Sequence, residues 1–221
     1  MNLPVAEFHP LSVDRLTAEP PITTMRHEFA PTCIWTFTVP DHERLNAELI
    51  ALIEEERRNS PESRACEGRE MWQSQRQVSD DPPVRELFTS IFRVAAEIAA
   101  FLRWDIAGKK PACKVCWANI HMKGGYHTRH IHPATIQLSG VYYAKANKGC
   151  GDLIFHDLSR FLGLWAGAPS TLELTSHNRS RLAVEPEPGL GVLFPAYVMH
   201  EVAANRSDDE RIGLAYNINF E

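Results

Sequence analysis

The stretch Arg211-Ile212-Gly213-Leu214-Ala215-Tyr216-Asn217-Ile218-Asn219-Phe220 alternates strictly between large apolar residues and small or polar ones. Successive side chains of a β-strand point to opposite faces, so this period of two predicts a strand with one buried face. The apolar face carries Ile212, Leu214, Tyr216, Ile218 and Phe220. The opposite face carries Arg211, Gly213, Ala215, Asn217 and Asn219, and its small residues leave room for something other than protein.

The same period of two extends upstream to about Cys113, in short segments that we predict to be strands. These segments are Cys113–His121, Tyr126–His132, Ile136–Ala144, Asp152–His156, Ser170–Leu174, Arg181–Val184, Gly191–Phe194 and Val198–Ala203. Turn-forming residues separate them, as at Lys123-Gly124-Gly125 and Asn147-Lys148-Gly149. Many short strands with such turns indicate an antiparallel β-sandwich of the jelly-roll or cupin-like type.

The N-terminal half contains the predicted helices. After a proline-rich beginning with a short strand near Cys33–Val39, a helix is predicted from Asp41 to about Arg58. Asp41 is expected to accept hydrogen bonds from the first amides of this helix. A polar stretch over 59–81 follows, and a second helix begins at Pro82 and runs to Leu102.

These patterns predict a mainly β fold with N-terminal helices packed on one sheet. We expect one domain over residues 1–221, in which residues 1–110 form a helical support and residues 111–221 form the jelly-roll core. No internal repeat or linker divides the chain.

Composition excludes several classes of protein. The 221 residues include 44% apolar residues, 23 Lys and Arg, and 28 Asp and Glu, which give a net charge of −5. This excludes wholesale disorder and argues against a fold-wide surface for nucleic acid or anionic membranes. No apolar run reaches the roughly 18–20 residues that span a bilayer, and the N-terminus lacks a signal-peptide layout. The five cysteines are too few and too odd in number for a disulfide framework, so we expect a cytoplasmic location.

Three histidines form the predicted metal site. His130 and His132 stand two apart on a predicted strand, so both imidazoles should project from the same face. Two such imidazoles can bind one metal ion at about 2.0–2.1 Å. A later apolar strand turns at Pro195 and delivers His200, which can complete the site because late and early strands of a jelly roll can be neighbours. Solvated or core histidines are the alternative interpretation.

Arg211 indicates an anionic ligand. It shares its predicted strand face with Gly213 and Ala215, which leave space beside the guanidinium. A guanidinium is a fixed cation whose planar fork suits a carboxylate. The alternative is an ion pair at the rim with the acidic residues of the preceding turn, namely Asp208, Asp209 or Glu210.

Several segments together carry a resemblance to a known family. They are Trp117-Ala118-Asn119, Gly124 to His132 with Pro133, Ser139-Gly140-Val141-Tyr142-Tyr143, Phe194-Pro195, and the run from His200 through Asn205 and Arg211 to Asn217. In these segments the chain resembles a bacterial and phage family of 2-oxoglutarate- and Fe(II)-dependent oxygenases, related to the prolyl hydroxylases. The resemblance covers most of residues 30–220.

The resemblance implies a double-stranded β-helix in which early-strand and late-strand residues hold the catalytic Fe(II), and we assign this role to His130, His132 and His200. Arg211 would bind the distal carboxylate of the cosubstrate 2-oxoglutarate, and Asn119, Tyr143 and Asn217 would complete the cosubstrate pocket. The chain would then be an oxidoreductase, a dioxygenase that hydroxylates an unidentified substrate and releases succinate and CO2.

Partners follow only in outline from the sequence. A small molecule and a peptide are both open as the substrate, and no nucleic acid or membrane is expected as a partner. A homodimer is compatible with the sequence. Residues 59–81 and the loop Phe161–Ala168 are expected to decide the substrate, and this loop would either cover the pocket or pack in the core.

One position departs from the wider superfamily, which uses two histidines and a carboxylate in the order His-x-Asp or His-x-Glu. Here position 132 is histidine. Asp152 or Asp157 could instead supply a carboxylate, with His132 or His127 in a supporting or substrate-binding role. We prefer the set of three histidines because the two-residue spacing brings both side chains to one face.

Two other functions fit parts of the sequence. Gly124 with His130 and His132, and Gly189 with Pro195 and His200, approximate the two halves of a cupin signature. A cupin-type dioxygenase with three histidine ligands would need no 2-oxoglutarate. A β-sandwich binding module without catalysis is the third possibility.

Overall fold

The computed structural model describes residues 32–62, 70–156, 172–176 and 179–221. These residues belong to one compact unit, Thr32–Glu221. Its two helices are α2 (His42–Asn59) and α3 (Pro82–Phe101). Its strands are β1 (Trp35–Thr38), β2 (Met71–Gln73), β3 (Pro111–His121), β4 (His127–His130), β5 (Leu138–Lys145), β6 (Leu153–His156), β7 (Arg181–Val184), β8 (Leu190–Pro195), β9 (Met199–Val202) and β10 (Arg211–Phe220).

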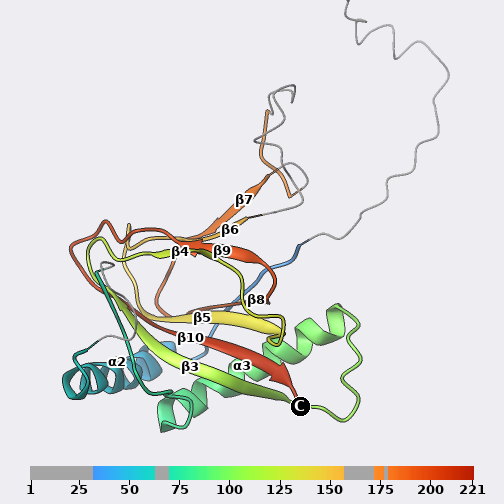
Figure 1. Cartoon of the computed structure of the whole chain (residues 1–221), viewed down its shortest axis with the longest axis horizontal. Helices are drawn as coiled ribbons and strands as arrows, with labels where there is room; N and C mark the ends of the chain where they lie inside the picture. Colours follow the sequence, from blue (N-terminus) through green and yellow to red (C-terminus); the bar gives the residue numbers. More distant parts are fainter. Residues whose placement is uncertain (1–31, 63–69, 157–171, 177–178) are drawn as a thin grey trace, which may run out of the picture. The chain divides into compact units, whose positions relative to one another are not determined.

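The described strands form two antiparallel sheets. The larger sheet has the order β1-β8-β5-β10-β3-β2, and the smaller has the order β4-β9-β6-β7. Helices α2 and α3 lie on one side of β5, β10 and β3, and the smaller sheet lies on the other side (Figure 1). This confirms the predicted mainly β fold with helices packed on one sheet. Strands β1 and β2, from the expected helical support, extend the larger sheet at its two edges.

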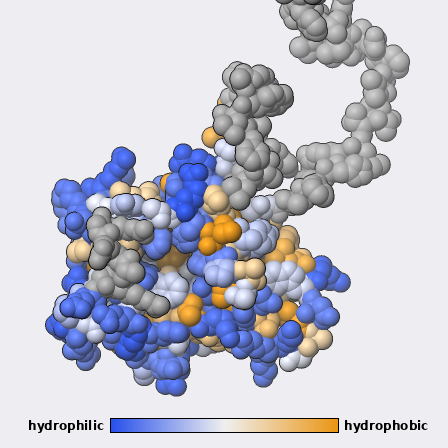
Figure 2. Space-filling model, in the orientation of Figure 1, coloured by the Kyte–Doolittle hydropathy of each residue, from blue (hydrophilic) through white to orange (hydrophobic). Residues whose placement is uncertain are grey.

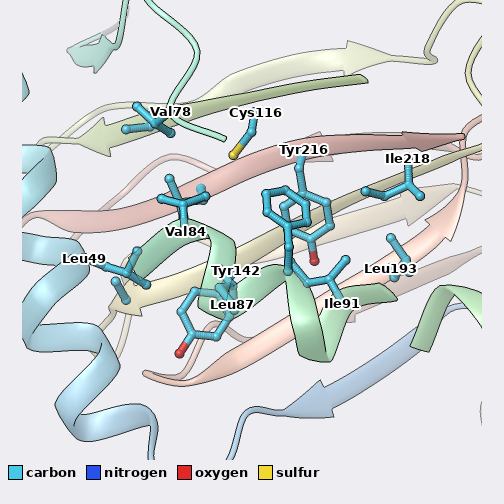
Figure 3. Packing of buried hydrophobic residues seen from close by; sticks show 14 of the residues in the cluster. Leu49, Val78, Val84, Leu87, Ile91, Cys116, Tyr142, Leu193, Tyr216 and Ile218 are labelled. Atoms are coloured by element: carbon cyan, nitrogen blue, oxygen red, sulfur yellow. The ribbon is translucent and has the colours of Figure 1, made fainter. Parts of the chain in front are cut away.

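The helices pack on the apolar face of the larger sheet. Ile212, Leu214, Tyr216 and Ile218 of β10 share one buried cluster with residues of both helices, including Leu45, Leu49, Val84, Leu87 and Ile91. Figure 3 shows six of these side chains between the helices and the sheet, namely Leu49, Val84, Leu87, Ile91, Tyr216 and Ile218. Burying one such side chain contributes about 1.5–3 kcal/mol, so this cluster holds the helices to the sheet.

Several predicted boundaries are confirmed and others are wrong. Strands β7 and β10 have the predicted bounds, whereas the strand expected over Tyr126–His132 ends at His130. A strand was expected over Ser170–Leu174, but residues 172–174 form no strand. Residues 170–171 and the loop Phe161–Ala168 lie outside the described residues. Strand β2 was missed because three residues within a polar stretch are too few to show a period.

The expected cap of α2 is also wrong. Asp41 has a φ of 53°, in the left-handed region, and makes no side-chain hydrogen bond to the helix amides. A capping side chain needs a backbone in the β region to reach those amides. The carboxylate instead accepts a hydrogen bond from Arg44 Nε at 2.6 Å.

The exterior agrees with the composition. Hydrophilic residues cover most of the face in Figure 2, and hydrophobic residues occur there in small patches. Neither helix in the described ranges is both long and apolar enough to span a membrane.

Tyr142 ties the larger sheet to α2. Its hydroxyl donates a hydrogen bond of 2.7 Å to Asn46 Oδ1, and both residues are buried. We expect Tyr142→Phe to lower the free energy of unfolding by about 1–3 kcal/mol, because Asn46 Oδ1 would lose its partner. Tyr197, which is 65% exposed, provides the matched control. Tyr197→Phe should change the stability by less than about 0.5 kcal/mol in the same urea titration. Equal effects of the two substitutions would contradict this role of Tyr142.

Candidate metal centre and pocket

The second face of β10 forms the wall of a pocket. Strand β10 lies between β3 and β5, so that Arg211 faces His121, Gly213 faces Asn119 and Tyr143, and Asn217 faces Ser139 in register. Residues directly opposite each other in antiparallel strands point to the same side. All seven line one pocket, which is partly open to solvent. A concave site with an apolar lining and a few polar groups suits a small organic ligand.

Three histidines converge at this pocket. One ring nitrogen each of His130, His132 and His200 lies within 4.8 Å of the other two. The ring centroids of His130 and His200 are 4.2 Å apart, because these residues face each other across β4 and β9. The His132 ring lies 5.3 Å from that of His130 and 5.2 Å from that of His200. The predicted convergence of these three residues is therefore present in the fold.

His132 reaches the site for a different reason than the one predicted. Strand β4 ends at His130, so the two-residue strand period does not extend to His132. The backbone N–H of His132 instead donates a hydrogen bond of 3.1 Å to Ala196 O, in the turn between β8 and β9. This contact ties the segment after β4 to the turn that precedes His200.

Backbone contacts determine which nitrogens of His130 and His200 are available. Nδ1 of His130 lies 2.7 Å from Thr128 O, and Nδ1 of His200 lies 2.9 Å from Val198 O. A carbonyl oxygen only accepts, so both Nδ1 atoms carry the hydrogen and both Nε2 atoms keep a lone pair. Burial lowers the pKa of His200 to about 3, although its bond to Val198 acts in the opposite direction.

Like His200, His132 is held neutral. Burial, with a smaller contribution from His130, lowers the pKa of His132 to about 4. Its Nε2 lies 2.9 Å from Ser139 Oγ. A neutral imidazole has a lone pair for a cation, so at neutral pH His132 and His200 are ready to act as ligands.

This donor set fits iron. Imidazole nitrogens suit iron, and also zinc, copper and nickel. The group of three contains no carboxylate, and Asp152 is not part of it. Asp157 lies outside the described residues. His127, the other alternative, lines the pocket with its ring 4.8 Å from that of His130 but does not belong to the group.

Arg211 lies at the opposite end of the pocket wall from Ser139 and is buried, with 3% exposure. Its Nη1 donates to Cys150 O at 3.1 Å and also to Gly151 O. The N–H groups on Nε and Nη2 have no acceptor among the described residues. The rim acids are already paired, because Asp208 binds Lys123, Asp209 binds Lys145 and Glu210 binds Arg57. The rim ion pair considered as the alternative for Arg211 is therefore absent from this part of the chain.

The other predicted cosubstrate residues line the same pocket, while their roles stay predictions. Burial raises the pKa of Tyr143 to about 12, and its ring centroid lies 5.9 Å from Arg211 Cζ. Asn119 Oδ1 accepts a hydrogen bond from Gln73 Nε2 at 2.9 Å. Asn217 Oδ1 is buried and has no hydrogen-bond partner among the described residues.

His121 and Ser139 line the pocket but were not predicted as site residues. Nε2 of His121 is buried and makes no hydrogen bond within the described part of the chain. The period of β3 could have identified His121, because Trp117 and Asn119 share its pocket face while Ala118 and Ile120 lie in the helix-facing cluster. Ser139 carried no such signal, since its role depends on contact with a residue of another segment.

Known structures have the same fold. The Pseudomonas putida prolyl-4-hydroxylase matches with a TM-score of 0.58 and 16% identity, over 86% of this chain and 94% of that one. The non-heme alpha ketoglutarate dependent carbocyclase SnoK from nogalamycin biosynthesis gives a TM-score of 0.61 and 13% identity, over 85% and 79% of the two chains. HygX from Streptomyces hygroscopicus, with nickel and 2-oxoglutarate bound, gives 0.56 and 11%, over 95% and 87%.

Comparison of the sequence with family models gives a match over part of the chain. No curated protein matches the sequence. The model of the family described as "Putative 2OG-Fe(II) oxygenase" matches residues 115–217, which span the pocket wall, the three histidines and Arg211. The resemblance stated from the sequence agrees with this match: through residues 115–217 the chain is similar to that family of oxygenases, and the solved structures show the same fold.

Proposed function

We propose that this protein is an Fe(II)- and 2-oxoglutarate-dependent dioxygenase that hydroxylates a substrate not yet identified, with succinate and CO2 as co-products. The observation that carries the proposal is the shared pocket of three imidazoles and a guanidinium with free N–H groups. The family match over residues 115–217 supports it. This match favours a 2-oxoglutarate-dependent dioxygenase over a cupin-type dioxygenase or a binding module without catalysis.

The pocket residues divide the work between its two ends. His130, His132 and His200 would hold Fe(II), which supplies the chemistry for O2 activation and oxidative decarboxylation in this class of enzyme. At the other end, the free N–H groups of Arg211 can bind a carboxylate as a bidentate pair. Along β5 the interval from Ser139, beside His132, to Tyr143, beside Arg211, is about 13 Å of strand. A dicarboxylate can lie between these ends.

Apolar side chains surround the reacting centre. Val141, Leu153, Phe194 and Val202 line the pocket, and Phe194 packs on His200 with the ring centroids 4.7 Å apart. Apolar surroundings of low polarity strengthen the attraction between Arg211 and a bound carboxylate. They also protect reactive species from side reactions with water.

The cellular location of this protein and its partners are also matters of proposal. We propose a cytoplasmic location, supported by the free thiols of Cys113, Cys116 and Cys150. Fractionation of the native cells would test this, and recovery of the protein outside the cytoplasm would contradict it. We propose a small molecule or a peptide as the substrate, and neither nucleic acid nor a membrane as a partner. A homodimer is also proposed, and a measurement of mass in solution would test it.

Binding of 2-oxoglutarate tests the proposal. Calorimetry with the Ni(II)-loaded protein, which binds without turnover, should show one 2-oxoglutarate per chain. Arg211→Ala should weaken this binding at least about tenfold, since each hydrogen bond to a charged group contributes about 1.5–3 kcal/mol. The affinity of Arg211→Lys for 2-oxoglutarate should lie between those of the wild type and Arg211→Ala, because lysine keeps the positive charge but lacks the planar fork of the guanidinium.

Arg206, which is exposed and outside the pocket lining, provides the control. Arg206→Ala should bind 2-oxoglutarate as the wild type does. With Fe(II) and ascorbate the wild type should also convert 2-oxoglutarate slowly to succinate. A wild-type protein that binds no 2-oxoglutarate, but takes up oxygen when given a thiol, would support the cupin-type function instead.

His121 is expected to make the free energy of unfolding of the protein depend on pH. Burial, reinforced by Arg211 and His127, holds the pKa of His121 well below its usual value of about 6.5. In the unfolded chain this imidazole takes up a proton below about pH 6.5, whereas in the folded protein it does not. The unfolded state then binds more protons, so the free energy of unfolding falls as the pH drops.

We expect His121→Gln to remove this contribution. Below about pH 6, the plot of unfolding free energy against pH should become shallower by up to about 1.4 kcal/mol per pH unit, the value for one proton. Urea titrations at several pH values measure this slope independently of the absolute stability of the variant. Parallel curves for the wild type and the variant would show that His121 is charged in the folded protein.

A further inference from the structure

We propose that His132 binds the metal through Nδ1, while His130 and His200 bind through Nε2, and that Ser139 and Asn217 form a relay that fixes this orientation. The inference rests on the proposed function, because it concerns how the same three histidines would hold the metal. It makes Ser139 and Asn217 positioning residues, which act on the metal through the His132 ring.

The outward nitrogens of His130 and His200 are already accounted for. Both Nδ1 atoms donate to carbonyl oxygens, at 2.7 Å to Thr128 and at 2.9 Å to Val198. Each of these carbonyls lies two residues before its histidine in the chain. The two strands therefore present Nε2 to the pocket by the same local arrangement.

His132 has the opposite arrangement. Its Nε2, and not its Nδ1, is engaged, at 2.9 Å from Ser139 Oγ. A nitrogen that donates a hydrogen bond has no lone pair left for a metal, so Nδ1 is the ligand atom when Nε2 donates to Ser139. Nδ1 is three bonds from Cα, as a carboxylate oxygen of aspartate is. A histidine in this position can thus place a nitrogen where an Asp of a His-x-Asp site would place its oxygen.

Asn217 completes the relay. When Ser139 Oγ accepts a hydrogen bond from His132, its own proton needs an acceptor. Asn217 faces Ser139 directly across β10 and β5, and both residues line the pocket. Its Oδ1 is buried without any partner among the described residues. An unsatisfied buried acceptor is costly, and the hydroxyl of the directly opposite Ser139 is the donor that we assign to it.

Co(II) is a suitable probe, because it replaces iron in imidazole sites and shifts the proton resonances of its ligands. A ring bound through Nε2 has both C–H groups next to the bound nitrogen, so both resonances are broad. A ring bound through Nδ1 keeps Cδ2–H remote from the metal. The Co(II)-loaded protein should therefore show one sharp, shifted, non-exchanging ring C–H resonance, and His132→Gln should remove it.

Variants of the relay give a second readout. Ser139→Ala should weaken Co(II) binding by about 10–100-fold. It should also abolish the exchangeable Nε2–H resonance of His132, while the Nδ1–H resonances of His130 and His200 persist. Ser139→Thr, which keeps the hydroxyl, should restore both. Asn217→Ala should weaken binding in the same direction, and the double variant should lose no more than Ser139→Ala alone.

Ser90 on α3 provides the matched serine control, because it lies outside the pocket lining. Ser90→Ala should bind Co(II) as the wild type does. A wild-type spectrum without the sharp resonance would show that His132 binds through Nε2 and would overturn the proposal. An unchanged Co(II) affinity in Ser139→Ala or in Asn217→Ala would remove that residue from the relay. Both outcomes leave the proposed function intact if the protein still binds 2-oxoglutarate, whereas a protein that binds no Co(II) would overturn both.

Discussion

The structure depends on the position of β10 between two different environments. It pairs with β3 on one side and β5 on the other. One face of β10 packs on α2 and α3, and the other forms the pocket wall. A shift of one residue in either pairing would exchange these faces, placing Arg211 in the helix-facing core and Leu214 in the pocket. The packing of the helices therefore also secures the register that forms the site.

Charge is arranged along this wall in a way that favours a bridging anion. Three neutral imidazoles leave a bound Fe(II) with one more positive charge than a site that contains a carboxylate. At the other end, the buried guanidinium of Arg211 donates hydrogen bonds to backbone carbonyl oxygens and lies over the ring of Tyr143. Within the described chain it pairs with no carboxylate. A dicarboxylate would compensate both cations. Burial keeps His121 neutral, and repulsion from the neighbouring Arg211 adds to this effect.

Individual residues show what the sequence could predict about the site. Arg211, Asn119 and Tyr143 line one pocket; the face of Arg211 followed from the strand period, whereas Asn119 and Tyr143 were expected there only from the resemblance. His132 was predicted to join His130, but for the wrong reason, because its position depends on a hydrogen bond to Ala196. Ser139 was not predicted as part of the site. Its contact with His132 joins two segments that the sequence pattern describes separately.

The sequence by itself determined the jelly-roll class, the two helices, the two faces of β10 and the choice of three histidines and one arginine as candidate site residues. These follow from local periods and residue chemistry, which each segment carries without reference to the others. The tertiary structure decided which nitrogen of each histidine is free, which acids at the rim are already paired, and which buried atoms lack a partner. Such properties depend on distances between segments far apart in the chain, and a linear pattern contains no information on those distances.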